Sequence, residues 1–232
     1  IDKVDDNTKF SLLIQTNEKA VRSVENSKNS IKEAIHKILD KVNNTNSSRI
    51  IYCGAGTSAR VGVQDGSELY PTFGWPINRV DYIIAGGTNA LIKSIENAED
   101  DIDDAKLQVG AKNINKNDVV IGLTASGNTP FTCEVIKEAK KRGALTIGIS
   151  NNSNGNINKI SELPILLDTG PETVVGSTRL KAGTAQKICL NIISTILMIK
   201  LGRVERGMMN FLVPTNKKLK KRKALINYIL KS

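Results

Sequence analysis

The chain has 232 residues, of which 40% are hydrophobic and 4% are aromatic, and its formal net charge is +10. This length and composition suit one α/β domain with an aliphatic core, or one such domain with helical additions. They argue against a membrane protein, because no apolar run approaches the roughly 20 residues that a span needs. The N-terminus has neither the basic nor the apolar region of a signal peptide, so we expect a cytoplasmic protein.

The positive charge is concentrated near the C-terminus. Residues 217–223 (KKLKKRK) carry six of the ten net charges, so the rest of the chain carries only +4. This pattern is typical of the solvated face of a terminal helix, and no aromatic residues alternate with the charges. We therefore expect no nucleic-acid partner. The alternative, DNA binding through the basic tail, would depend strongly on salt.

Few side chains suit metal or nucleophilic chemistry. Cys53, Cys133 and Cys189 lie far apart in apolar segments, without CxxC spacing, and are typical of core residues in a reducing compartment. His36 is the only histidine, which argues against a histidine zinc site and a Ser-His-Asp triad within one chain. We expect no metal and no cofactor.

In chain order, two N-terminal helices are expected at residues 7–16 and 23–42. Strands are then expected at 49–53, 79–85, 118–123, 145–150 and 163–167. Helices are expected at 59–69 and 131–142, followed by a long apolar helix at 182–201 and a basic amphipathic helix at 215–230. Alternating strands and helices predict an α/β fold: a three-layer αβα sandwich around a five-stranded, mainly parallel sheet, with N- and C-terminal helical additions. We divide the chain into a helical segment (1–46), this domain (47–212) and the basic C-terminal helix (213–232).

Three turns rich in glycine or hydroxyl residues follow strands, at 54–58, 86–87 and 124–129. The carboxyl ends of parallel strands meet at one edge of a sheet, so these turns are expected to share a rim. The stretch 124–130 (TASGNTP) leads from a strand into a helix, with Pro130 well placed as first helical residue. Its amides and hydroxyls are typical of a phosphate site, although an ordinary capped turn fits the same pattern.

Two other phosphate ligands fit less well. Gly54-x-Gly56-x-x-Ala59 nearly matches a dinucleotide fingerprint, but the second strand does not end in the acidic residue that would hold a ribose. Asp81 lies at the start of that strand instead, and no GxxxxGK[ST] motif occurs. Several neutral donors converging on one anion favour a small-molecule phosphate monoester.

The chain resembles the N-acetylmuramic acid 6-phosphate etherases, within the phosphosugar-binding domain of the sugar isomerases. The resemblance rests on the motifs GAGTSARVGVQDGSELYPTFG, IIAGG, ENAEDD, GLTASGNTP, GPETVVGSTRLKAGTAQK and PTNKKLKKR, in order. It implies removal of the lactyl ether from C3 of N-acetylmuramate 6-phosphate, by elimination and rehydration. Such chemistry needs two carboxyl groups and a phosphate anchor.

The resemblance also implies roles for particular residues. Glu68 matches the family's acid, which would protonate the leaving oxygen, and Glu99 matches a second glutamate, which would take the C2 proton; the two roles could be exchanged. The residues expected to hold the phosphate are Ser126, Gly127 and Thr129 with Thr57 and Ser58, and more weakly Ser177 and Thr178. Glu172 is expected to bind sugar hydroxyls or to order its loop. Arg179 and Lys181 would meet the phosphate or the lactyl carboxylate, or make surface pairs.

Each of these residues also has a purely structural interpretation, as a surface acid or a helix cap. At the level of the whole protein, the alternatives are a non-catalytic sugar-phosphate sensor and an aldose–ketose isomerase. Asn128 stands where the family commonly has Arg. We expect a homodimer that binds a small sugar phosphate, with no membrane partner.

Overall fold

Five parallel strands form the centre of the computed structural model, which describes residues 1–231. Their bounds are β1 (Ile50–Gly54), β2 (Val80–Ile84), β3 (Val119–Thr124), β4 (Leu145–Ser150) and β5 (Leu163–Leu166). They pair in the order β2-β1-β3-β4-β5, and every neighbouring pair is parallel. The expected five-stranded sheet is confirmed, and its strands differ from the predicted ranges only at their ends.

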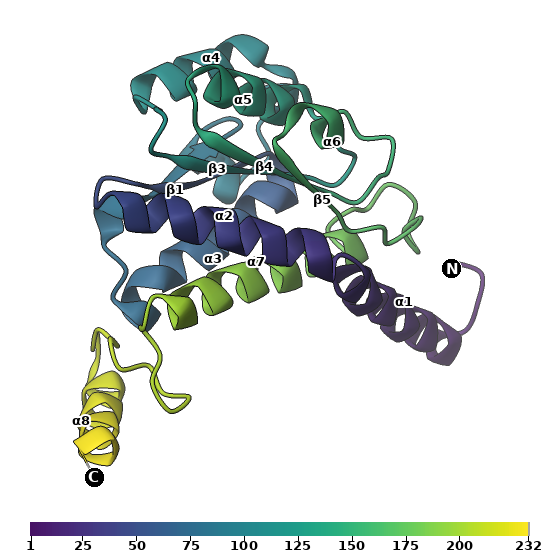
Figure 1. The fold of residues 1–232 in the computed structure, drawn as a ribbon. Coiled ribbons are helices and arrows are strands. Elements are labelled where there is room, and N and C mark those ends of the chain that lie inside the picture. The colour runs from purple at the N-terminus through teal and green to yellow at the C-terminus, as the bar shows by residue number, and fades with distance from the viewer. Residues whose placement is uncertain (232) are drawn as a thin grey trace.

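Helices cover both faces of the sheet (Figure 1). One face carries α2 (Lys28–Asn44), α3 (Gly56–Phe73) and α7 (Lys181–Lys200), and the other carries α4 (Ile102–Ala111), α5 (Pro130–Lys141) and α6 (Ile157–Ile160). Three short 3-10 turns, Ile77–Arg79, Thr88–Leu91 and Ala98–Asp100, lie between these elements. The helices α1 (Asp6–Asn26) and α8 (Lys217–Lys231) extend away from the layers (Figure 1). The predicted αβα sandwich with helical additions is therefore confirmed.

The strand sequences are nearly all apolar because both faces of the sheet are covered. Successive side chains of a strand point to opposite faces. In β3, Val119, Ile121 and Leu123 therefore pack in the cluster that contains α2, α3 and α7, whereas Val120 packs with α5. The helix α2 supplies Ile31 and other residues to the first cluster, so the N-terminal segment contributes to the core.

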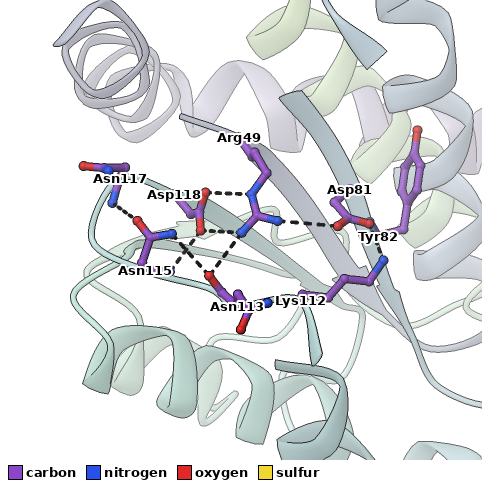
Figure 2. Close-up of polar contacts among 8 residues, drawn as sticks. All are labelled: Arg49, Asp81, Tyr82, Lys112, Asn113, Asn115, Asn117 and Asp118. Carbon is purple, nitrogen blue, oxygen red and sulfur yellow. Dashed lines mark hydrogen bonds and ion pairs between the residues drawn. The ribbon is translucent and has the colours of Figure 1, made fainter. Parts of the chain in front are cut away.

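An ionic cluster ties the amino ends of β1, β2 and β3 together (Figure 2). The Arg49 guanidinium donates to the fully buried Asp118 carboxylate at 3.0 and 2.8 Å, and this bond raises the pKa of Arg49. Arg49 also lies 3.8 Å from the Asp81 carboxylate, which pairs with Lys112. Asp81 is thus engaged at the sheet edge opposite the rim, so it is not the ribose-binding acid of a dinucleotide site.

The three cysteines are free and buried, as expected for core residues. Burial raises the pKa of the Cys53, Cys133 and Cys189 thiols, so they remain protonated near neutral pH.

Within residues 1–231, α7 alone is long and apolar enough to cross a membrane by length and composition, contrary to our interpretation of the sequence. However, 56% of its apolar window is buried in the structure, where α7 packs against α1, α2 and α3. A core position explains its composition.

Candidate functional site

The candidate site lies at the carboxyl ends of the strands, where the chain changes direction across the sheet. After β1 the chain enters α3 on one face, and after β3 it enters α5 on the other face. Since β1 and β3 are neighbours, the two loops that follow them diverge and border a crevice at this switch point. The predicted phosphate residues Thr57, Ser58, Ser126 and Thr129 all lie in these two segments.

In the first segment, the helix begins at an earlier residue than the sequence predicted. A turn was expected through residue 58, but α3 begins at Gly56, whose φ is +54°, so Thr57 and Ser58 lie in the first helical turn. No side chain among the described residues caps this helix, and its first amide groups are available for an anion. Ser58 is only 8% exposed, and its hydroxyl makes no hydrogen bond to another described residue.

The second segment is held by its own hydroxyl groups. The Thr124 and Thr129 hydroxyls lie 2.8 Å apart, the Gly127 N–H donates to the Thr124 hydroxyl at 3.2 Å, and the Asn128 N–H donates to Ser126 at 3.1 Å. Gly127 has a φ of +74°, and a Cβ atom there would lie 2.4 Å from the Cα of Gly155. Glycine is therefore required at this position, and Ser126 remains exposed at the rim.

A third segment runs from β5 to the start of α7. The Glu172 carboxylate accepts hydrogen bonds from the backbone N–H groups of Lys181 and Ala182, at 3.3 and 2.9 Å, and so caps α7. The Lys181 side chain is 2% exposed, and its ammonium donates to the Pro171 carbonyl. Lys181 thus holds this loop from a buried position, and it makes no surface ion pair with another described residue. Arg179 and Thr178 are exposed, and Ser177 is half-buried.

Two of the cavities at this rim have volumes of about 400 and 390 Å³. The first lies at the ends of β3, β4 and β5 and is lined in part by Ser126, Glu172 and Thr178. The second lies at the ends of β1 and β2 and is lined in part by Thr57 and Glu99. A Cβ atom on Gly183 would lie 3.1 Å from the Thr57 methyl and 3.4 Å from the Thr178 carbonyl, so the walls of the two cavities adjoin there.

The two proposed catalytic glutamates do not line a common cavity of this chain. Glu99 is exposed in the 3-10 turn Ala98–Asp100 and lines the second cavity. Glu68 is exposed on α3, twelve residues after Gly56, which corresponds to about 18 Å along the helix axis. Glu68 lines neither cavity.

Sequence reasoning missed several lining residues. Asn151, Asn152 and Ser153 line the first cavity and belong to the loop after β4. The sequence did contain a signal for these residues. They form a polar run directly after a buried strand, and such a run falls on the same rim. Arg60 lines the second cavity, but its guanidinium donates to the carbonyls of Ala90 and Leu91, which fixes the neighbouring loop.

The sequence is similar to those of several etherases. An N-acetylmuramic acid 6-phosphate etherase of Clostridium acetobutylicum is 46% identical over 215 residues, which cover 92% of this chain and 70% of that protein. One from Oceanobacillus iheyensis is 48% identical over 189 residues, which cover 82% of this chain and 64% of that protein. Across these and six further etherases, the chain spans 57% to 75% of the relative's length.

The fold is shared with solved phosphosugar proteins. A phosphoheptose isomerase from Francisella tularensis matches with a TM-score of 0.60 at 19% identity, covering 83% of this chain and 96% of that one. The Vibrio vulnificus NanR protein, solved with ManNAc-6P, matches with a TM-score of 0.57 at 13% identity, covering 94% of this chain and 68% of that one. The family model of the glucokinase regulatory protein N-terminal SIS domain matches residues 30–140. With its identity to the Clostridium acetobutylicum protein extending over most of both sequences, this chain belongs to the N-acetylmuramic acid 6-phosphate etherase family.

Proposed function

We propose that the chain is a carbon–oxygen lyase that cleaves the D-lactyl ether of N-acetylmuramic acid 6-phosphate, releasing D-lactate and N-acetylglucosamine 6-phosphate. The observation that carries this proposal is membership of the etherase family, since the aligned region includes the whole rim. The activity takes place in the cytoplasm, as part of amino-sugar catabolism and cell-wall recycling.

The phosphate binds at the switch point between β1 and β3. The uncapped start of α3 offers amide groups with partial positive charge, and Thr57, Ser58, Ser126 and Thr129 add hydroxyls from both sides of the crevice. A phosphate monoester accepts several such hydrogen bonds at once.

The chemistry begins when the sugar ring opens. The C1 aldehyde then acidifies the C2 proton, and Glu99 removes that proton from its position in the second cavity. As the C3–O bond breaks, a carboxylic acid protonates the departing lactyl oxygen, which leaves as the hydroxyl of lactate. Water then adds its oxygen to C3 and a proton returns to C2, so the atoms balance.

We assign the acid role to Glu68, acting from a second subunit. Its place on α3 keeps it from the Glu99 cavity of its own chain. A carboxyl group stays protonated near neutral pH only when it is partly desolvated, and Glu68 is exposed in the single chain. A homodimer could satisfy both requirements, because the second subunit would cover the Glu68 carboxyl group and Glu68 would reach the Glu99 cavity of that subunit.

The test is release of lactate from N-acetylmuramic acid 6-phosphate by the purified protein. Glu99→Gln and Glu68→Gln should each lower kcat by about a hundredfold or more, as expected for loss of an acid or base. Glu96→Gln is the matched control, because Glu96 lines the same cavity as Glu99, and it should retain most activity.

Other outcomes would identify other functions. Binding of sugar phosphates without lactate release would indicate a sensor, the alternative favoured by the match to the glucokinase regulatory protein domain. Formation of a ketose phosphate from an aldose phosphate would indicate an isomerase.

A further inference from the structure

The second rim cavity carries two cationic side chains that the proposed reaction steps do not use. Arg60 and Lys93 line it together with Glu96 and Glu99, so the formal charges of these side chains cancel. The first cavity is lined in part by carboxylates but by no described lysine or arginine. Of these two cavities, the one that contains the proposed base is therefore the one that can attract a second anion.

The Lys93 ammonium has no partner in the part of the chain that the structure describes. The side chain is exposed, and it makes no hydrogen bond or ion pair with another described residue. Glu96 follows closely in the sequence, but the chain is not helical there and the two side chains do not pair. An unpaired ammonium group beside a cavity is available to a ligand carboxylate or phosphate.

Arg60 fixes the part of the chain that carries Lys93. The Arg60 guanidinium donates to the carbonyls of Ala90 and Leu91, both at 2.9 Å. The Lys93 N–H in turn donates to the Asn89 carbonyl at 3.0 Å. The backbone at Lys93 is therefore anchored to α3 although its side chain is exposed, and this preorganisation lowers the entropy that is lost when the side chain binds a ligand.

The other anion-binding groups at the rim are neutral or lie elsewhere. The proposed phosphate site consists of the amide groups at the start of α3 and of hydroxyls such as those of Thr57 and Ser126. Arg179 and Lys181, which the sequence also suggested for an anion, line neither cavity. With the phosphate held by neutral donors, the positive charge of the second cavity remains for a different anionic group.

The proposed substrate carries such a group close to its reacting carbons. In the D-lactyl ether, only the ether oxygen and one carbon separate C3 from the carboxylate, and C3 adjoins the C2 from which Glu99 would remove the proton. The substrate carboxylate must therefore come near the ionised Glu99, and like charges repel each other in a partly closed site. A cation that lines the same cavity offsets this repulsion.

We propose that Lys93, on the turn that Arg60 fixes, binds the carboxylate of the lactyl group and makes the site selective for ethers that carry an acid. This inference rests on the proposed etherase function, because that function places the reacting carbons beside Glu99. The contact also restricts rotation about the C3–O bond, which orients the leaving oxygen.

The test compares N-acetylmuramic acid 6-phosphate with N-acetylglucosamine 6-phosphate, two ligands that share the phosphate and differ in the lactyl group. Isothermal titration calorimetry is carried out in the Glu99→Gln background, in which the first ligand is turned over slowly. There, Lys93→Met should weaken binding of N-acetylmuramic acid 6-phosphate about tenfold, the scale of one charge-assisted hydrogen bond, and change binding of the other ligand by less than about twofold. The control is Lys106→Met, an exposed lysine of α4 that lines neither cavity and should affect neither ligand.

Two results would overturn the proposal. Equal weakening of both ligands would mean that Lys93 binds the phosphate, and unchanged affinity for both would mean that Lys93 is an ordinary surface lysine. A neutral analogue, in which a carboxamide replaces the lactyl carboxylate, provides an independent check. The protein with Lys93 should bind the carboxylate about tenfold more tightly than the carboxamide, and Lys93→Met should remove this preference. A preference that survives the substitution would place the carboxylate elsewhere.

Failure of this inference can be distinguished from failure of the etherase function. If the native protein releases no lactate but prefers the carboxylate ligand through Lys93, the lyase is rejected and the binding site is kept. If lactate is released with a kcat/KM that Lys93→Met leaves unchanged, the lyase is kept and the role of Lys93 is rejected. If neither sugar phosphate binds, both proposals are rejected.

Discussion

The backbone N–H of Asn156 donates a hydrogen bond to the side-chain oxygen of Asn128 at 2.8 Å, which joins the loop after β4 to the loop after β3. Two backbone bonds reinforce this link, from Ile157 to Gly127 at 2.9 Å and from Asn151 to Ala125 at 3.0 Å. The loop after β4 therefore holds the candidate phosphate loop, residues 124–129, in place. Asn128 acts in that support, and its side chain is committed to protein partners.

Replacing Asn128 by Ala should loosen the loop and weaken binding of N-acetylglucosamine 6-phosphate about fivefold, the scale of one lost hydrogen bond. Isothermal titration calorimetry measures this change. Asn154→Ala is the control, because this exposed side chain belongs to the same β4 loop and makes none of these bonds. Equal affinities of the two variants would mean that the Asn128 bond does not position the loop.

Glu172 should act mainly as the cap of α7. Glu172→Ala leaves the N–H groups of Lys181 and Ala182 without their acceptor and should lower the free energy of unfolding by about 1 kcal/mol. Glu172→Gln keeps an acceptor and should lose less. Urea denaturation measures both. Unchanged stability combined with lost sugar-phosphate binding would assign Glu172 to the ligand instead.

Asp118→Asn should destabilise the fold strongly. It removes the charge that pairs with Arg49 in the cluster shown in Figure 2, and we expect a loss of about 3 kcal/mol, as for a broken buried pair. Asp103→Asn breaks an exposed pair with Lys106 and should cost less than about 0.5 kcal/mol. Similar losses of unfolding free energy in both variants would show that the buried Arg49–Asp118 pair stabilises the fold no more than the exposed Asp103–Lys106 pair does.

Stability should fall at alkaline pH. Burial raises the pKa of Tyr82 to about 12 and that of Tyr52 well above its usual value, whereas an unfolded tyrosine titrates near 10. Above about pH 10 the unfolded chain therefore loses protons that the folded chain retains, and the free energy of unfolding decreases as pH rises. Tyr82→Phe should make this decrease shallower between pH 10 and 12. Denaturation curves measured at several pH values give this dependence. If the free energy of unfolding falls equally steeply with pH in the native protein and in Tyr82→Phe, Tyr82 is not a source of the decrease.

The strands could be predicted from sequence because their burial is nearly uniform. Val119 to Leu123 is apolar throughout, since its alternate side chains enter two different helical layers. The start of α3 could not be predicted as well. Gly56 and its neighbours have the composition of a turn, and only the left-handed φ of Gly56 lets the helix begin there.

The site was harder to predict because its residues come together only in the folded chain. The order of the turns along the chain indicated a shared rim, and Thr57 and Ser126 do lie there. By contrast, the burial of Lys181 depends on the path of the loop through Pro171, and the distance of Glu68 from the rim depends on how far α3 extends. Neither property is encoded in a local motif.

The most direct test of the proposed function is the fate of oxygen when N-acetylmuramic acid 6-phosphate is incubated with the protein in ¹⁸O-labelled water. Elimination and rehydration predict one ¹⁸O atom at C3 of N-acetylglucosamine 6-phosphate and an unlabelled hydroxyl in D-lactate, which mass spectrometry resolves. Label in the lactate hydroxyl, or no turnover at all, would contradict the account.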